Sequence, residues 1–245
     1  MRKRADVLLV ERGFFESRAK ARAAIEAGGV TADGAPVAKA SQEVDEAAEL
    51  TVPDSHQWVG RGALKLLHAL DTWPIAVEGR VVLDVGASTG GFTEVVLSRG
   101  AARVYAVDVG RGQLHPRLAA DPRVVSLEGL DARSLTAAHM PEPPGLVVTD
   151  VSFIGLAKAL PAALALAPPD ADLVALVKPQ FEVGPERVGK GGLVKDDAAR
   201  ADAVAGVRTF LEGAGWAVQA VVESPVTGGD GNVEFLLWAK AKGRP

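Results

Sequence analysis

The feature that most constrains the fold of this chain is a series of short apolar runs that alternate with segments of helical length. Five runs read VVLDVG, RVYAVDV, VVSLEG, GLVVTDV and LVALVKP, and helix-like segments cover residues 91–98, 154–166 and 196–214. Such alternation is typical of an α/β fold with a parallel, Rossmann-like sheet covered on both faces. Two last runs, WAVQAVVES and VEFLLWAKA, flank the glycine-rich PVTGGDGN, which predicts a hairpin and an antiparallel edge.

The first 52 residues follow a different pattern and predict a separate small α+β domain. Residues 5–12 and 18–27 read as two short helices, the second with Ser17 as its N-cap. A hairpin at Asp33–Gly34 and a short strand, AELTV, complete the unit. The polar PDSHQW reads as a linker. We therefore expect a first domain at residues 1–53, a linker at 54–60 and a second domain at 61–245.

Basic residues are concentrated near the N-terminus. The chain has a formal net charge of −4, but residues 2–22 hold seven lysines and arginines against three acidic residues. Arg18 and Arg22 lie four positions apart, so they share one face of the second helix. This asymmetry suggests a local anion-binding surface.

Several classes of protein are excluded by residue types that the sequence lacks. There is no cysteine, so a disulfide framework, an iron–sulfur cluster and a cysteine nucleophile are impossible. The histidines show no metal-ligand spacing, and we expect no metal; they are His56, His68, His115 and His139. The most apolar late run, ALPAALALAPP, is too short and too rich in proline to span a bilayer as a helix. A cytoplasmic location fits these observations.

The stretch DVGASTGGF lies where a doubly wound sheet binds its ligand, at the end of a strand and the start of a helix. Its glycine spacing differs from that of a dinucleotide site. Asp108 follows at the distance expected of a carboxylate that accepts hydrogen bonds from ribose hydroxyls, and Asp131 is placed to bind an adenine amine. A ribose and a base without a pyrophosphate fit S-adenosylmethionine. The candidate cofactor residues are Asp84, Gly86, Ala87, Ser88, Gly90, Gly91, Asp108, Asp131 and Asp150.

The stretch GPERVGKG, residues 184–191, comes close to a phosphate-binding P-loop. Gly191 occupies the position of the hydroxyl that would bind magnesium, so nucleotide hydrolysis is disfavoured. A flexible basic lid that carries Arg187, Lys190 and Lys195 is the better interpretation, and RNA would be its natural partner.

The sequence also narrows the methyl acceptor. Attack through carbon 5 of a pyrimidine needs a cysteine, and methylation of exocyclic amines usually involves a [DN]-P-P-[YF] motif where this chain reads TDVSF. A hydroxyl acceptor remains. Four charged residues lie where they could meet around it, namely Lys65, Asp150, Lys178 and Glu234. Asp150 and Lys178 end strands on the cofactor side of the sheet.

Roughly residues 2–52 resemble the S4 RNA-binding domain, and the resemblance is carried by RADVLLVERGFFESRAKARAAIEAGGVTADGAPV. The resemblance implies that Arg4, Arg18, Lys20 and Arg22 contact RNA phosphates, which positions RNA without reading its sequence. We add Arg61, Arg187 and Lys190 as further candidate RNA-binding residues.

Residues 59–242 resemble the FtsJ-type ribose 2′-O-methyltransferases, whose Lys-Asp-Lys-Glu tetrad matches the four charged residues named above. With an S4 domain in front, the chain is similar to the TlyA family. That resemblance implies S-adenosylmethionine-dependent methylation of cytidine 2′-hydroxyls in ribosomal RNA, and some members are called haemolysins. The family motif SRGAxK reads GRGALK here, and HQWV fills the linker.

The role of Lys178 stays open at this point. A lysine removes a proton only when it is neutral, and a free lysine has a pKa of about 10.4. A charged lysine would instead steer the hydroxyl and stabilise the developing alkoxide. Three other functions compete with this one: a haemolysin-like membrane-active protein, a non-catalytic S4 RNA-binding protein and a nicotinamide dehydrogenase.

Overall fold

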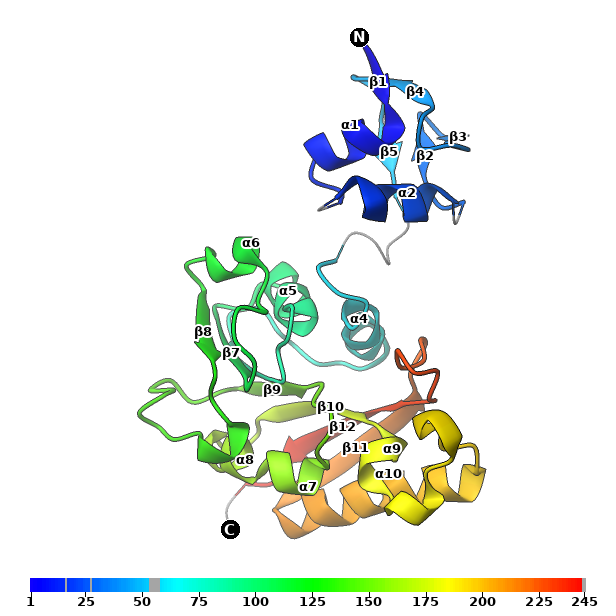
Figure 1. Ribbon diagram of the computed structural model, residues 1–245. Helices are drawn as coiled ribbons and strands as arrows, with labels where there is room; N and C mark the ends of the chain where they lie inside the picture. The colour runs from blue at the N-terminus through cyan, green and yellow to red at the C-terminus, as the bar shows by residue number, and fades with distance from the viewer. Residues whose placement is uncertain (16, 27, 53–57, 244–245) are drawn as a thin grey trace. The chain divides into compact units, whose positions relative to one another are not determined.

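The computed structural model describes residues 1–15, 17–26, 28–52 and 58–243. It divides into two compact units, Met1–Arg61 and Gly62–Pro245 (Figure 1). Residues 53–57, which include His56 and most of the expected linker, lie outside the described residues.

The described residues of the N-terminal unit form two short helices and two small sheets. Its helices match the two expected from the sequence; the elements are β1 (Arg2–Arg4), α1 (Ala5–Glu11), α2 (Arg18–Glu26), β2 (Thr31–Ala32), β3 (Ala35–Pro36), β4 (Glu43–Asp45) and β5 (Leu50–Thr51). Strands β3, β2 and β5 form one antiparallel sheet, and its hairpin turns at Asp33 (φ 50°) and Gly34 (φ 76°). The pairing of β1 with β4 was not anticipated. Apolar faces of both helices meet in one core, which includes Leu8, Leu9 and Ile25.

The C-terminal unit contains the predicted sheet of seven strands. Its order is β11-β12-β10-β9-β6-β7-β8. The bounds are β6 (Val81–Val85), β7 (Arg103–Asp108), β8 (Val124–Glu128), β9 (Leu146–Thr149), β10 (Asp172–Val177), β11 (Trp216–Glu223) and β12 (Phe235–Ala241). Strands β6 to β10 pair in parallel, while β12 is antiparallel to both of its neighbours. The expected antiparallel edge is therefore confirmed.

Helices cover this sheet on both faces (Figure 1). They are α4 (Ala63–Thr72), α5 (Gly91–Ser98), α6 (Pro116–Ala119), α7 (Leu156–Ala159), α8 (Pro161–Leu166), α9 (Pro179–Glu182) and α10 (Asp197–Gly213), with 3-10 turns η1 (Ala132–Ser134), η2 (Pro185–Arg187) and η3 (Lys190–Gly192). The segment expected as one helix at 154–166 is two, because Pro161 starts α8 and cannot continue α7. One core cluster joins Leu83 and Val147 of the sheet to Leu160 and Leu211 of the helices.

The strand directions decide where functional side chains gather. The parallel strands β6, β7, β9 and β10 all end at one edge of the sheet. Because β12 runs the other way, it begins at that edge, where Phe235 pairs with Val177. Glu234 precedes Phe235 and Lys178 follows Val177, so the register places these two residues side by side.

Candidate active site

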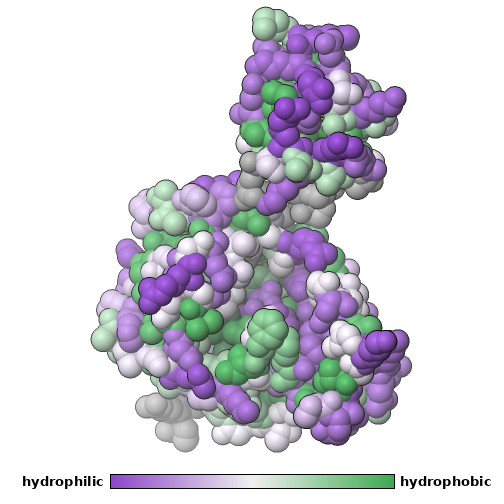
Figure 2. Space-filling model, in the orientation of Figure 1, coloured by the Kyte–Doolittle hydropathy of each residue, from purple (hydrophilic) through white to green (hydrophobic). Residues whose placement is uncertain are grey.

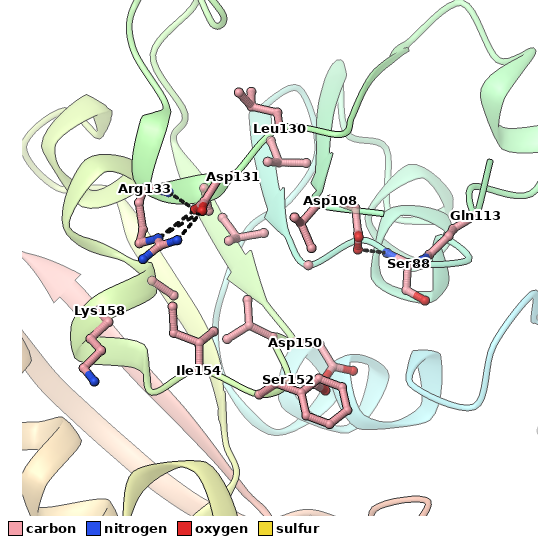
Figure 3. A pocket seen from close by; sticks show the side chains of 18 residues that line it. Ser88, Asp108, Gln113, Leu130, Asp131, Arg133, Asp150, Ser152, Ile154 and Lys158 are labelled. Atoms are coloured by element: carbon pink, nitrogen blue, oxygen red, sulfur yellow. Dashed lines mark hydrogen bonds and ion pairs between the residues drawn. The ribbon is translucent and has the colours of Figure 1, made fainter. Parts of the chain in front are cut away.

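A pocket of about 700 Å³ opens at the carboxyl ends of the parallel strands (Figure 3). It is lined by 18 residues, among them Gly86, Ser88, Asp108, Asp131 and Asp150. Five of the nine candidate cofactor residues therefore line one pocket. The other four, Asp84, Ala87, Gly90 and Gly91, are not among the lining residues.

The glycine loop bends sharply against the end of β9. Gly86 has a φ of 83°, and a Cβ there would lie 3.0 Å from the carbonyl oxygen of Asp150, so only glycine fits. Asp108 then ties the loop to β7: its Oδ2 accepts from the Ser88 N–H (2.8 Å) and its Oδ1 from the Gly110 N–H (2.7 Å). Each carboxylate oxygen keeps capacity for another donor, so Asp108 can also accept from a ligand in the pocket.

Gly90 has a packing role in the structure. Its φ is 96°, and a Cβ there would lie 2.3 Å from Leu118 Cδ1 and 2.8 Å from Leu114 Cδ1. A glycine at this position therefore lets the start of α5 approach α6 closely.

Asp84 is fully buried beneath the loop. Thr93 Oγ1 donates to its Oδ2 (2.7 Å), but its Oδ1 has no hydrogen-bond partner among the described residues. Burial raises the pKa of Asp84 to about 7, and the nearby Asp150 carboxylate adds to that rise. The structure thus places this carboxyl behind the pocket wall, in a state that is easily protonated.

Asp131 lies in the opposite wall of the pocket, paired with Arg133 (Figure 3). Arg133 Nη2 approaches Oδ2 to 2.5 Å, and the backbone N–H of Arg133 donates to Oδ1 (2.9 Å). The hydrogen bonds from Arg133 lower the pKa of Asp131 to about 2. Arg133 was not predicted as a pocket residue, although its position two residues after Asp131 is visible in the sequence.

The four charged residues predicted to meet form two ion pairs. On one side Lys65 Nζ donates to Glu234 Oε2 (2.5 Å), and the two side chains are 9% and 2% exposed. On the other side Lys178 Nζ lies 2.6 Å from Asp150 Oδ1. Asp150 also lines the pocket, so the second pair connects the pocket to the charged cluster.

The two pairs act as one electrostatic cluster. Burial raises the pKa of Glu234, and the hydrogen bond from Lys65 opposes that rise. The charge of Lys178 also lowers this pKa, while the charge of Asp150 raises it. The ionisation of Glu234 therefore depends on the other three groups. Such coupled charges in a cleft are typical of catalytic sites.

Two glycines make room for this cluster. A Cβ on Gly62, just before α4, would lie 3.2 Å from Asp150 Oδ2. A Cβ on Gly228, in the connection between β11 and β12, would lie 2.7 Å from Glu234 Oε1. A side chain at either position would therefore require the neighbouring carboxylate to shift.

Residues 58–241 match the FtsJ-like methyltransferase family, and residues 3–50 match the S4 domain. A Mycobacterium tuberculosis protein, 16S/23S rRNA (cytidine-2′-O)-methyltransferase TlyA, is 51% identical over 98% of this chain and 91% of its own length. The chain belongs to the TlyA family. Hemolysin A of Brachyspira hyodysenteriae is 36% identical over 95% of this chain and 98% of its own.

Solved structures agree with this assignment to the TlyA family. A Streptococcus thermophilus protein, 38% identical, superposes with a TM-score of 0.77 and covers 100% of this chain and 90% of that one. An S-adenosylmethionine dependent methyltransferase from Mesorhizobium loti, 16% identical, has a TM-score of 0.54 over 73% of this chain and 98% of its own. The second likeness shows the fold alone: a Rossmann-like methyltransferase fold preceded, in this TlyA-family chain, by an S4 domain.

Several side chains around the site were missed from the sequence. Ser152 Oγ accepts from Lys178 Nζ (2.8 Å). Phe153 lines the pocket, is 91% exposed, has a φ of 67° and lies 5.3 Å from the ring of Phe181. An aromatic residue three positions after Asp150 was visible in TDVSF, but its exposure was not.

Glu128, at the end of β8, is another residue that the sequence did not single out. Its carboxylate accepts from the backbone N–H groups of Gly112 (2.9 Å), Gln113 (2.6 Å) and Leu114 (3.0 Å). These hydrogen bonds lower the pKa of Glu128. Because Gln113 lines the pocket, Glu128 fixes a loop that forms part of its wall.

The candidate RNA-binding residues fall into two groups. In the N-terminal unit Arg4, Arg18 and Arg22 line a second pocket. Hydrophilic residues dominate the visible face of this unit (Figure 2). Lys20 and Arg61 are exposed.

In the C-terminal unit the predicted lid is held in place by hydrogen bonds. Arg187 pairs with Asp202 of α10 (2.7 Å), and Lys190 is exposed. The buried Asn232 accepts from the Val194 N–H (2.9 Å) and donates to the Gly192 carbonyl (2.8 Å). The segment that follows Lys178 is thus tied to the chain just before Glu234.

Within the described ranges, no group of three or more histidine, cysteine or acidic side chains is arranged to hold a metal ion. Among the same residues, no helix has the length and apolar character needed to cross a bilayer.

Proposed function

We propose that this protein transfers the methyl group of S-adenosylmethionine to a ribose 2′-hydroxyl of ribosomal RNA, with cytidine as the target. The observation that carries the proposal is the continuity between pocket and charged cluster: Asp150 lines the pocket and pairs with Lys178 at 2.6 Å. A nucleoside cofactor in the pocket would present its reactive group to this cluster. Since the proposed substrate is ribosomal RNA, we place the protein in the cytoplasm.

The pocket residues suit S-adenosylmethionine. A volume of about 700 Å³ falls in the range of small-molecule sites. We propose that Asp108 accepts from the ribose hydroxyls, that Asp131 binds the adenine amine, and that Leu130 and Ile154 supply apolar contacts. The cofactor brings a methyl group on a positively charged sulfur; the protein has to bind it, orient it and exclude water.

Lys178 is proposed as the residue that acts on the acceptor hydroxyl. Its amine donates to Ser152 Oγ (2.8 Å) and forms an ion pair with Asp150, whose Oδ1 lies 2.6 Å away. These contacts fix the position of the amine at the end of β10, which supports a role in orienting the hydroxyl and stabilising the developing alkoxide. The proton would then leave through Asp150 or water. Lys65 and Glu234 would complete the field around the reacting oxygen.

The exposed ring of Phe153 is proposed as a stacking surface for the target base. Proteins that recognise unstacked nucleotides in RNA stack the displaced bases on aromatic side chains. A phenylalanine that is 91% exposed at the wall of the pocket fits this role. The RNA would be held by the S4 domain, with the domain boundary proposed at residues 54–60.

The experiment is to map ribose methylation on ribosomal RNA from cells that lack the gene. The cells are complemented with the parent, with Lys178→Ala, or with Lys242→Ala as a matched control at an exposed lysine outside the pocket lining. We expect a cytidine methylation that the parent and the control restore and Lys178→Ala does not. The proposal is wrong if deletion leaves every ribose methylation unchanged. Leakage of dye from liposomes would then test the activity named for the Brachyspira relative.

A further inference from the structure

The basic face of the N-terminal unit is organised around one buried acidic side chain, Asp6. Arg4 donates to this carboxylate through Nε (3.0 Å to Oδ1) and Nη2 (3.1 Å to Oδ2). Arg18 donates through Nε and Nη2 (3.1 and 2.8 Å, both to Oδ2). The side chain of Asp6 is only 5% exposed, whereas those of Arg4 and Arg18 are 48% and 58% exposed. The acid is enclosed while both cations stay at the surface.

The position of Asp6 is itself fixed by the backbone. Its N–H donates to the carbonyl of Ala40 (3.1 Å), and the N–H of Ala5 donates to the carbonyl of Gln42 (2.8 Å). Arg4 ends β1 and Arg18 begins α2. One carboxylate therefore connects side chains from two elements that are far apart in sequence, and it cannot move without the start of α1.

Both arginines keep donors for a ligand. A guanidinium group has five N–H donors, and each arginine uses two of its nitrogen atoms on Asp6. Together with Arg22, Lys39 and Ser41 they line a surface pocket of about 630 Å³. The remaining donors form a fork that suits phosphate oxygens.

We propose that Asp6 is a positioning residue for RNA binding, which holds the guanidinium groups of Arg4 and Arg18 in one relative geometry so that their free donors meet the phosphate oxygens of a folded RNA. The inference rests on the RNA-binding function proposed above. Holding the two arginines in place has an entropic advantage, because long side chains that are already ordered lose less conformational freedom when they bind RNA.

The negative charge of Asp6, considered alone, predicts that its removal strengthens RNA binding. The positioning role predicts weaker binding, so the two can be distinguished by experiment. Neutralising an acid inside a phosphate-binding pocket should strengthen binding to any polyanion. If Asp6 positions the arginines, its neutralisation should instead weaken binding to a folded RNA. Glu26 provides the matched control: it lines the same pocket and pairs with Arg22 at 2.7 Å, but its side chain is 57% exposed.

The test measures filter binding of the full chain to folded 23S ribosomal RNA and to polyuridine, for the parent, Asp6→Asn and Glu26→Gln. We expect Asp6→Asn to weaken binding to 23S RNA roughly tenfold, the scale of one lost charge-assisted hydrogen bond. Binding to polyuridine should stay unchanged or tighten, and Glu26→Gln should weaken neither. In methyl-transfer assays Asp6→Asn should raise KM for RNA and leave kcat and S-adenosylmethionine affinity unchanged. Equal 23S affinity for Asp6→Asn and Glu26→Gln overturns the inference.

A second variant covers the case in which Asp6→Asn unfolds the unit, as judged by thermal melting. Arg4→Lys with Arg18→Lys keeps both charges and leaves Asp6 in place, but lysine lacks the planar fork. Weaker binding to 23S RNA with unchanged binding to polyuridine supports the inference, and parent-like binding to both overturns it. A parent protein that binds neither RNA would overturn the RNA-binding function itself, which is a different result.

Discussion

Asp6 and Asp84 are buried aspartates, one in each compact unit, and their carboxyls have opposite properties. Asp6, in the N-terminal unit, is 4% exposed and accepts four hydrogen bonds from two arginines, which lower its pKa to about 2. Asp84, in the C-terminal unit, is 0% exposed and accepts one hydrogen bond from a threonine side chain, so burial raises its pKa to about 7. Burial alone therefore does not decide ionisation; the donors around the carboxyl do.

The difference extends to the cations of the two units. In the N-terminal unit the acid is buried and its arginines remain in water, an arrangement that suits reversible binding of a polyanion. In the C-terminal unit Lys65 and Lys178 are themselves buried beside Glu234 and Asp150. Enclosed charges interact strongly, which suits a reaction in which charge develops.

The largest expected effect is on the free energy of unfolding, and it distinguishes a buried ion pair from an exposed one. Glu234→Gln leaves the Lys65 ammonium buried without its counter-charge, so we expect the free energy of unfolding to fall by about 3–5 kcal/mol. Glu26→Gln breaks an exposed pair and should change it by less than about 1 kcal/mol. Denaturant titration followed by tryptophan fluorescence and circular dichroism measures both. The double variant Lys65→Met with Glu234→Gln should recover most of the loss; no recovery would mean that the pair is not the cause.

The pH dependence of stability should distinguish Asp6 from Asp84. The pKa of Asp84 is raised in the folded protein, so its contribution to stability is present below the unfolded value of 3.8 and is lost as pH rises towards 7. Relative to the parent, Asp84→Asn should therefore gain stability over this window, by up to about 4 kcal/mol. Asp6 has the opposite sign: its contribution is present above pH 3.8 and is lost as pH falls towards 2. A parent and an Asp84→Asn protein with parallel stability curves between pH 4 and 7 would contradict the raised pKa.

Lys178 tests whether the enclosed charges serve chemistry rather than binding. Lys178→Ala should lower kcat about a hundredfold or more and leave the affinities for S-adenosylmethionine and RNA within a few-fold, because the group acts mainly in the transition state. Lys178→Arg keeps the charge but cannot give up a proton. Substantial activity of the arginine variant would favour the electrostatic role over the role of base. Full activity of the alanine variant would remove Lys178 from the mechanism.

Substitution of the exposed arginines should weaken RNA binding, whereas substitution of Lys178 should lower kcat. Arg18→Ala with Arg22→Ala should weaken RNA binding about tenfold or more and flatten its salt dependence, because fewer counterions are released. The affinity for S-adenosylmethionine should survive. Binding isotherms at several salt concentrations measure the slope. If affinity and slope both match the parent, the basic face is only a solvated surface.

The smallest expected effect concerns Glu128, whose carboxylate is held by backbone groups alone among the contacts described for it. Glu128→Gln weakens three charge-assisted hydrogen bonds to the loop at 112–114, so S-adenosylmethionine affinity should fall a few-fold while RNA affinity is unchanged. Calorimetric titration with the cofactor measures this. A loss of RNA binding of the same size would show that the loop has a wider structural role.

Much of the fold could be predicted because its signals are local. The apolar runs gave the strands of the large sheet, and α5 covers the expected residues 91–98. The β1–β4 pair was missed because its strands have three residues each and their partner lies about 40 residues away. The break between α7 and α8 was visible only as a proline within an otherwise helical pattern.

The site was predictable where residues follow strands and was missed where contacts depend on three-dimensional packing. Asp108, Asp131 and Asp150 stand at strand ends, and all three line the pocket. Asp84 is at the end of a strand too, but its side chain points into the protein, and the pattern cannot show on which side of the loop it lies. The partners Asp6, Ser152 and Glu128 carry no motif, because their roles arise from backbone and side chains brought together by folding.

The antiparallel strand β12 also determines at what stage of synthesis the charged cluster can be complete. β12 lies between β10 and β11 in the sheet, yet it is the last of the seven strands to be synthesised. Lys65 and Glu234 meet across 169 residues, and contacts so distant in sequence form late in folding. While translation continues, the sheet lacks an inner strand and the Lys65 amine lacks its partner. A nascent chain therefore has no assembled charged cluster until β12 has been synthesised and has joined the sheet.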